Sequence, residues 1–193
     1  MAITINGNGT VTGLTAAPNL TSSGLTTGKI LQVVKTNITT TSSASVPNAS
    51  LVDTPATVNI TSIGANSKFI ISGCISGEGT QADHVIGIVL RRVIGGSGAS
   101  INVGDSSGSR SSITSIHQQG LHSSDNASTP STCSMSAYVD SPSQAAGTTI
   151  TYKYALIGLG YTCTYYFGRA VSDVDNSSYE RMPNHITVME LAA

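Results

Sequence analysis

The stretch Thr148-Thr-Ile-Thr-Tyr-Lys-Tyr-Ala-Leu-Ile157 decides the fold class of this chain. Its large apolar and aromatic side chains recur at every second position, as Ile150, Tyr152, Tyr154 and Leu156. Successive side chains of a strand point to opposite faces, whereas a helix places one face at intervals of three or four residues. The stretch therefore predicts a β-strand with one face turned toward a core.

The same alternation, or a short apolar run, recurs along the chain with Gly, Asn and Ser between the runs. Spacings of about 8–12 residues with such turns are typical of a sandwich or jelly roll. We therefore predict an all-β fold, an antiparallel jelly-roll-like β-sandwich with an extended N-terminal arm. The expected strands are residues 29–37, 51–52, 57–63, 67–76, 84–94, 99–103, 113–117, 132–140, 148–157, 161–167 and 186–191, with the Ser/Thr tract 38–46 as an exposed extension of the first.

One expected strand differs from the others. Residues 84–94 carry Val and Ile on both faces, which predicts a central strand covered on both sides, either within a sandwich or between subunits. Only 10% of the 193 residues are charged, so the surface must be rich in Ser, Thr, Asn and Gly. Such a surface favours close-packed, repeated subunits, and we expect a homotrimer.

Charge and hydropathy exclude two classes of partner. The formal net charge is −1, and the largest basic cluster is the pair Arg91–Arg92, so we expect no nucleic-acid binding. No run reaches the roughly 18 apolar residues that cross a bilayer, so we expect no membrane insertion. The N-terminus lacks the basic start and apolar core of a signal peptide, which predicts folding in a cytoplasm.

The chain divides by composition into residues 1–28 and residues 29–193. Apolar residues alternate across a Gly-Asn-Gly turn in the first part, which predicts a small strand–turn–strand, and residues 15–28 form a Thr/Ser/Gly-rich connector. We interpret the first part as an attachment arm, with a solvated tail as the alternative. The residues expected to make the attachment are Ile3, Ile5, Val11 and Leu14.

Three cysteines lie within expected strands: Cys74, Cys133 and Cys163. We expect reduced, buried thiols, although a disulfide between two of them stays open. Gly104-Asp-Ser-Ser-Gly108 resembles the surroundings of a serine nucleophile, but Ser107 stands where that motif requires glycine. A catalytic serine also needs a histidine and a carboxylate held beside it. We therefore expect a turn here, no enzymatic activity and no cofactor.

Two polar loops, residues 118–131 and 171–184, are candidates for recognition. His117 and His122 are five residues apart, a spacing that fits neither a helical nor a strand metal pair, so a loop is favoured over a metal site gathered on a symmetry axis. The acidic loop around residue 175 lacks the Gly and Glu positions of a calcium loop. The exposed-loop recognition residues that we expect are His122, Asp125, Asp173, Asp175 and Tyr166.

Several phrases stand in a recognisable order: MAITINGNGTVTGL (1–14), GKILQVV (28–34), GDSSGSR (104–110) and ITVMELAA (186–193). In this order they resemble phage virion structural proteins, the tail-fibre-like and head-decoration proteins common in marine phages and cyanophages. The resemblance implies a homotrimeric β-rich appendage with an N-terminal virion-attachment segment, a C-terminal jelly-roll-like head and no catalytic residues. It places the protein in the virion, made in the host cytoplasm. The chain departs from long fibres because it has no repetitive shaft between Leu14 and Gly28.

Two virion roles follow from this resemblance. A tail fibre or short spike exposes its loops to a host surface glycan or protein, whereas a capsid decoration protein clamps its neighbours in the shell. A lectin or adhesin that binds sugar through Tyr165 and Tyr166 is the alternative from another class, although core packing is the commoner role of such a stripe. A hydrolase acting through Ser106 and His117 is a distant third.

Overall fold

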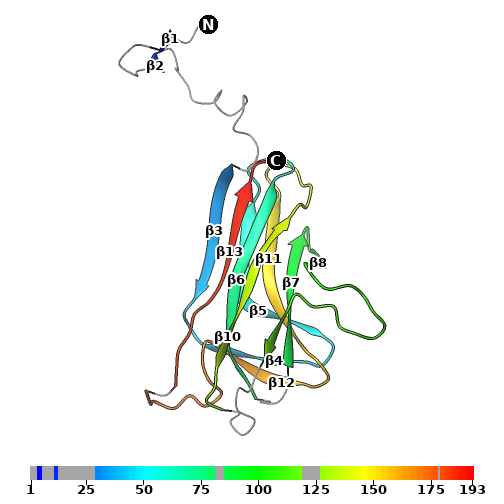
Figure 1. Ribbon diagram of the computed structural model, residues 1–193, viewed down its shortest axis with the longest axis vertical. Helices are drawn as coiled ribbons and strands as arrows, with labels where there is room; N and C mark the ends of the chain where they lie inside the picture. Colours follow the sequence, from blue (N-terminus) through cyan, green and yellow to red (C-terminus); the bar gives the residue numbers. More distant parts are fainter. Residues whose placement is uncertain (1–3, 6–10, 13–28, 81–84, 119–126, 178) are drawn as a thin grey trace.

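The computed structural model describes residues 4–5, 11–12, 29–80, 85–118, 127–177 and 179–193. Within them the chain is all-β and contains no helix, as Figure 1 shows. The strands are β1 (Thr4–Ile5), β2 (Val11–Thr12), β3 (Ile30–Ile38), β4 (Ser42–Val46), β5 (Leu51–Thr61), β6 (Lys68–Gly79), β7 (Val85–Ile94), β8 (Ser97–Ile101), β9 (Ser115–Gln118), β10 (Ser131–Asp140), β11 (Thr149–Gly158), β12 (Cys163–Phe167) and β13 (Asn184–Leu191).

Two antiparallel sheets form a sandwich. The first, which we call the terminal sheet, has the order β3-β13-β6, with β10 on the other edge of β6. On the same edge as β13, the C-terminal end of β6 pairs with β12, and β12 in turn pairs with β4. The second sheet has the order β5-β11-β7, and β8 and β9 share the outer edge of β7. The first long strand thus lies beside the last, and the chain between them crosses repeatedly from one sheet to the other. This is a jelly-roll arrangement and confirms the predicted fold class.

The core lies between the two sheets, where their alternating side chains meet. The stretch that decides the fold class behaves as predicted: all four of its alternating residues, Ile150, Tyr152, Tyr154 and Leu156, are buried. They face Ile71 and Val188 of the terminal sheet in one hydrophobic cluster. The aromatic stripe of β12 is core as well, because Cys163, Tyr165 and Phe167 are buried.

β5 is one continuous strand where two short ones are expected. Proline lacks the N–H that a central strand needs, and Pro55 is tolerated because β5 lies at a sheet edge and its register with β11 shifts there. The Thr54 hydroxyl bridges the irregularity: it donates to the Tyr154 carbonyl at 2.8 Å and accepts from the Ala56 N–H at 3.2 Å. Pro55 therefore marks a bulge rather than a gap between strands.

The Ser/Thr tract does not extend the first strand, and that expectation is wrong. Residues 42–46 form β4, which pairs with β12 over five residues and crosses the end of the terminal sheet. Small Ser and Ala side chains fit this place because β12 brings the bulky rings: Ala44 pairs with Tyr165 and Ser42 with Phe167. Only the pairing with a distant strand distinguishes β4 from an exposed extension.

The strand predicted to be apolar on both faces, residues 84–94, is β7, and residues of the same chain cover its middle on both faces. Val89 of β7 is 2% exposed, and a Cβ placed on Gly87 would meet Ile113 and Leu159. Of the two predicted explanations for this strand, the sandwich therefore holds for its middle, while Val85 and Val93 toward its ends are half-buried. The three cysteines are free; Cys74 and Cys163 are buried, and Cys133 is half-buried.

Candidate functional site

One end of the sandwich holds its two termini, and the other end holds the long loop between β12 and β13. The Ala192 N–H donates to the Lys29 carbonyl at 2.8 Å, so both termini of the sandwich lie at one end. In Figure 1 this end is at the top, and the loop between β12 and β13 lies at the bottom. We call the bottom the distal end, and the candidate site lies there.

The distal loop cluster is formed by Tyr166, Arg169, Asp173 and Arg181. The Arg169 guanidinium lies 4.1 Å from the centre of the Tyr166 ring, and its Nε lies 3.9 Å from an Asp173 carboxylate oxygen. Arg181 donates to the other Asp173 oxygen and, at 3.2 Å, to the Thr41 hydroxyl. Arg169 and Arg181 also form an isolated antiparallel bridge, so the backbone brings the two cations to one carboxylate.

The structure therefore joins two of the predicted recognition residues through a third that the sequence analysis does not single out. Tyr166 and Asp173 are brought together by Arg169, and Asp175 lies exposed in the same loop. His122 and Asp125 lie outside the described residues. The guanidinium occupies one face of the Tyr166 ring, so the cluster offers charged and hydrogen-bonding groups rather than a bare aromatic platform.

A buried carboxylate holds the distal loops in place. Glu78, at the end of β6, is 4% exposed, and its two oxygens accept from the Thr129 N–H at 2.9 Å and the Val171 N–H at 2.8 Å. One side chain thus fixes the loop before β10 and the loop after β12. Glu78 is a positioning residue that the sequence analysis missed, because the predicted strand ends at residue 76 whereas β6 continues to Gly79.

His117 is a core residue. It is 1% exposed, its ring lies edge-on to Tyr165, and its Nε2 is 3.1 Å from the Tyr165 hydroxyl and 3.2 Å from the Ser131 carbonyl. Burial lowers the pKa of His117 below its usual range, so the ring is neutral at physiological pH. It does not reach the surface where a symmetry-related metal site would require it.

A pocket of about 320 Å³ opens between β9 and β10. Cys133 is on its wall, with Sγ 3.4 Å from the Ser115 hydroxyl and 3.5 Å from the Ile116 carbonyl. Both contacts are with uncharged groups. The lining residues are Ile116, His117, Ser131, Thr132, Cys133 and Ser134, which supply hydroxyl and thiol groups.

A second thiol lies beside an imidazole on the outer face of the terminal sheet. Cys74 Sγ is 3.1 Å from His185 Nδ1, and the Pro183 carbonyl lies 3.7 Å from the same sulfur. Burial, followed by nearby Lys35, lowers the pKa of His185. Cys74 is 7% exposed, and this pair stabilises the contact between β6 and β13.

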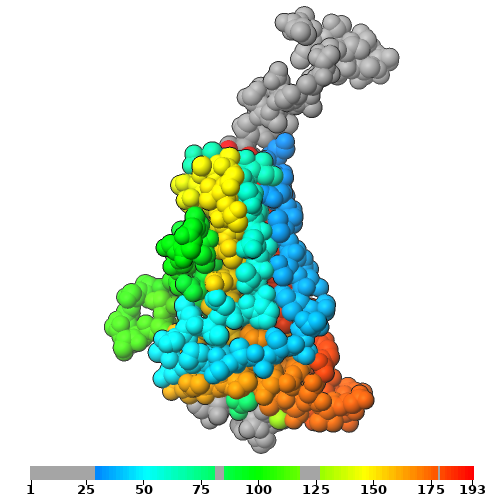
Figure 2. All heavy atoms as spheres, turned by 180° about the vertical axis from the view of Figure 1, so that it is seen from behind, coloured from blue at the N-terminus to red at the C-terminus, as the bar shows by residue number. Residues whose placement is uncertain are grey.

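The Gly-Asp-Ser-Ser-Gly stretch lies in a loop that projects from the flank of the sandwich between β8 and β9 (Figures 1 and 2). The Gly104 N–H donates to the Ile113 carbonyl at 3.2 Å and closes its base. Ser106 is exposed in this loop, whereas His117 is buried against Tyr165. The two residues considered for a hydrolase thus occupy an exposed loop and the core.

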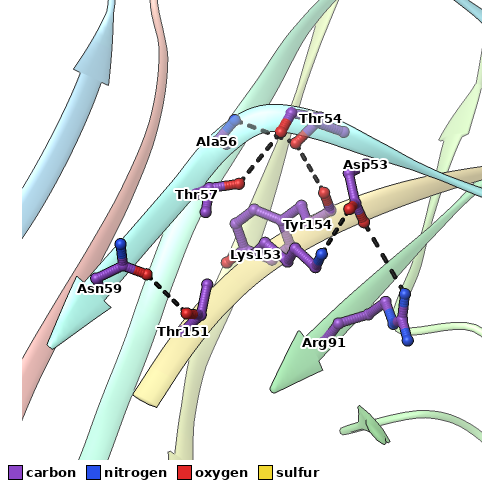
Figure 3. A network of polar contacts seen from close by, with 9 residues as sticks. All are labelled: Asp53, Thr54, Ala56, Thr57, Asn59, Arg91, Thr151, Lys153 and Tyr154. Atoms are coloured by element: carbon purple, nitrogen blue, oxygen red, sulfur yellow. Dashed lines mark hydrogen bonds and ion pairs between the residues drawn. The ribbon is translucent and has the colours of Figure 1, made fainter. Parts of the chain in front are cut away.

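The outer face of the second sheet is polar. Asp53 pairs with Lys153 and, at 3.9 Å, with Arg91, and the Thr151 hydroxyl donates to Asn59 at 2.7 Å (Figure 3). These side chains come from β5, β11 and β7 and cover the middle of the sheet with charges and hydroxyls. This face is suited to contact with water.

The predicted attachment residues are described only in part. β1 and β2 pair antiparallel with Ile5 opposite Val11, so the two expected short strands are paired, and the residues between them lie outside the described residues. Ile3 and Leu14 lie outside the described residues. Across the described part of the chain, no group of three or more His, Cys, Asp or Glu residues is arranged to hold a metal ion. A helix with the length and apolar character to cross a bilayer is likewise not found in that part.

No protein-family model and no curated protein matches this sequence. Among solved structures, the chain is similar to a structure of the infectious bursal disease virus Gx strain, with 10% identity, 83% of this chain and 40% of that chain covered, and a TM-score of 0.40. The chain is also similar to a structure of the Gt strain of the same virus, with 12% identity, 86% of this chain and 42% of that chain covered, and a TM-score of 0.42. A structure of Eiger TNF from S. frugiperda matches with 13% identity, 70% of this chain and 95% of that chain covered, and a TM-score of 0.28. The chain spans only about two fifths of the length of the two viral chains that it matches.

Proposed function

We propose that this chain is a non-enzymatic structural protein of a phage virion. In this proposal it forms a homotrimeric surface appendage, a tail fibre or short spike, that attaches to the particle through residues 1–28. Its distal loop cluster, formed by Tyr166, Arg169, Asp173 and Arg181, contacts a glycan or protein of the host surface.

One observation carries the proposal: Lys29 and Ala192, where the sandwich begins and ends, lie at the opposite end of the sandwich from the candidate site. Lys29, where the arm joins the sandwich, is hydrogen-bonded to Ala192, while the Arg169–Asp173–Arg181 contacts lie at the distal end (Figure 1). An arm attached to the particle would therefore hold the distal loops away from it. The jelly-roll fold, which occurs in viral capsid and lectin domains, and the resemblance of the quoted phrases support the same conclusion.

Particle composition tests the proposal. Quantitative mass spectrometry of purified virions encoding this chain should find it at tens of copies per particle. Hundreds of copies would replace the appendage with a capsid decoration protein, and absence from the virions would overturn both roles.

Two full-length variants separate attachment from recognition. Ile5→Asp with Val11→Asp places charges in the paired β1 and β2 segments and should abolish incorporation into particles while the sandwich melts as before. Arg181→Ala removes the contacts with Asp173 and Thr41 and should leave incorporation unchanged but reduce adsorption to host cells. Normal adsorption of particles carrying Arg181→Ala would show that the distal loop cluster does not bind the host.

A further inference from the structure

The outer face of the terminal sheet carries a row of four apolar side chains. In the strand register Val33 of β3 pairs with Met189 of β13, Met189 with Ile70 of β6, and Ile70 with Val139 of β10. Residues that pair across neighbouring strands point to the same face. Val188 and Ile71, their chain neighbours, are buried in the core, so the row points outward. Val33 is 55% exposed and Val139 is 50% exposed.

This row contrasts with the polar face on the opposite side of the sandwich. Ile30, 52% exposed, and Leu191, which pairs with it, extend the apolar surface toward the end where the termini lie. The second sheet places Asp53, Lys153 and Arg91 at its outer face. An antiparallel sheet that faces water alternates polar residues outward, as the second sheet does. The terminal sheet departs from that pattern along this row, although the next outward row, Lys35, Thr187 and Ser72, is polar. Contiguous exposed apolar surface marks an interaction site.

We propose that this apolar face is the contact surface between copies of the chain, arranged around a symmetry axis parallel to the strands. The proposal rests on the homo-oligomer of the proposed function and assigns its interface. With the faces turned toward a three-fold axis, the β3 edge of one copy meets the β10 edge of the next. Val33 of each copy then contacts Val139 of its neighbour.

The size of the face fits a trimer. Four strands about 4.8 Å apart and about 30 Å long give a face of about 600 Å² per copy. Three such faces bury about 1,800 Å² in the trimer, within the roughly 1,200–2,000 Å² of a stable assembly, although each pair of copies shares only about 600 Å², so the three contacts must form together. An axis parallel to the strands also places every Lys29–Ala192 pair at the same end, as joint attachment through the arms demands.

The apolar face carries few charges. The net charge of the chain is −1, so copies repel one another weakly. The charged residues of the face are Lys35 and Lys68, which lie on opposite sides of the apolar row. In the proposed arrangement Lys35 and Lys68 lie at different heights along the axis, so each lysine is level only with its own symmetry-related copies.

Cysteine cross-linking tests the inference in the full chain. Within one copy, Val33 and Val139 are three strand spacings apart, about 14 Å, too far for a disulfide. The double variant Val33→Cys/Val139→Cys should therefore form disulfides only between copies, giving covalent trimers on a non-reducing gel under mild oxidation. Each single variant should give no trimer and reports the background from the native cysteines.

A matched pair on the polar face provides the control. Thr57 and Ser100 lie in one row across the second sheet, joined through Lys153 and Arg91. Thr57→Cys/Ser100→Cys should stay monomeric on the same gel, and circular dichroism should show that both double variants are folded.

Three results would overturn the inference. They are a wild-type monomer by sedimentation, an oligomeric Val33→Cys/Val139→Cys protein without cross-links, and cross-links in the polar-face pair instead. Virion mass spectrometry reports separately on the proposed function, so a protein found in particles without this interface would refute only the inference.

Discussion

Arg92 and Asp140 join the two sheets across the sandwich. Arg92 belongs to β7 of the second sheet and Asp140 to β10 of the terminal sheet, and Nη1 of the arginine donates to both carboxylate oxygens at 2.7 and 2.9 Å. The Tyr152 hydroxyl donates to the same carboxylate at 2.8 Å. Asp140 is 4% exposed, so this carboxylate depends on its two partners for the hydrogen bonds that water would otherwise supply.

Removing the Asp140 carboxylate should destabilise the fold strongly. Asp140→Ala leaves the Arg92 charge and the Tyr152 hydroxyl without their acceptor, and breaking such a buried pair costs about 3 kcal/mol. Urea unfolding measures this difference in the free energy of unfolding. Asp53→Ala is the control, because Asp53 is half-exposed and pairs at the surface, where about 0–1 kcal/mol is expected. Equal losses in the two variants would contradict a special role for the buried pair.

Glu190 should make stability depend on pH. It is fully buried and accepts hydrogen bonds from Gln32 and from the Ile63 and Gly64 N–H groups. Burial alone raises the pKa of a carboxyl, but these donors outweigh it and lower the pKa of Glu190 below its usual value of 4.5. The stabilisation is therefore complete above pH 4.5 and is lost as the pH falls through the lowered pKa.

Glu190→Gln should remove that dependence. At pH 7 the variant should be less stable by about 1–3 kcal/mol, because its amide presents a donor where the Gly64 N–H needs an acceptor. The difference from wild type should shrink as the pH falls below 4.5, measured by urea unfolding at several pH values. Glu180→Gln, at an exposed position, should follow the wild-type curve. A difference that stays constant down to acid pH would refute this account.

Gly73 is required by the close approach of β13 and the core. A Cβ at this position would lie 2.3 Å from the His185 carbonyl oxygen and 2.9 Å from the Tyr154 ring. Gly73→Ala should cost about 1–3 kcal/mol or more, because backbone of the paired strand cannot move aside without disturbing the ladder. Gly104→Ala, where no atom lies within 4 Å, should change the melting temperature little. Comparable melting temperatures for the two variants would contradict the predicted crowding.

Glu78 should control the order of the distal loops. Glu78→Gln replaces a carboxylate that accepts the Thr129 and Val171 N–H groups with an amide that offers only one acceptor oxygen. Hydrogen exchange should speed up in residues 127–130 and 169–177 more than in β11. Asp175→Asn, an exposed change in the same loop, should leave exchange unaltered. Uniform acceleration over the whole chain would indicate global destabilisation instead.

Local patterns explain which predictions succeeded. The alternation of Ile150, Tyr152, Tyr154 and Leu156 identifies a half-buried strand because the period of two is a property of the strand itself. The short tract at Ser42–Val46 carries no such signal, and its pairing with β12 follows from residues more than a hundred positions away. Pro55 misleads for a related reason, since only the edge position and the register shift make it compatible with β5.

The residues of the candidate site were likewise predictable only in part. Asp173 and Tyr166 could be named from the sequence as polar or aromatic residues near a long loop. Their connection through Arg169, and the anchoring of the loop by Glu78, depend on distances that only folding creates.

The sequence by itself determined the all-β class, the positions of most strands and the weak charge of the surface, because these depend on side-chain period and composition. Only the tertiary structure decided that the termini of the sandwich and the distal loops lie at opposite ends, that the middle of β7 is covered by its own chain, and that Val33, Met189, Ile70 and Val139 form one row. The physical reason is that strand order and register bring together residues far apart in the chain. No local period encodes which strands will pair.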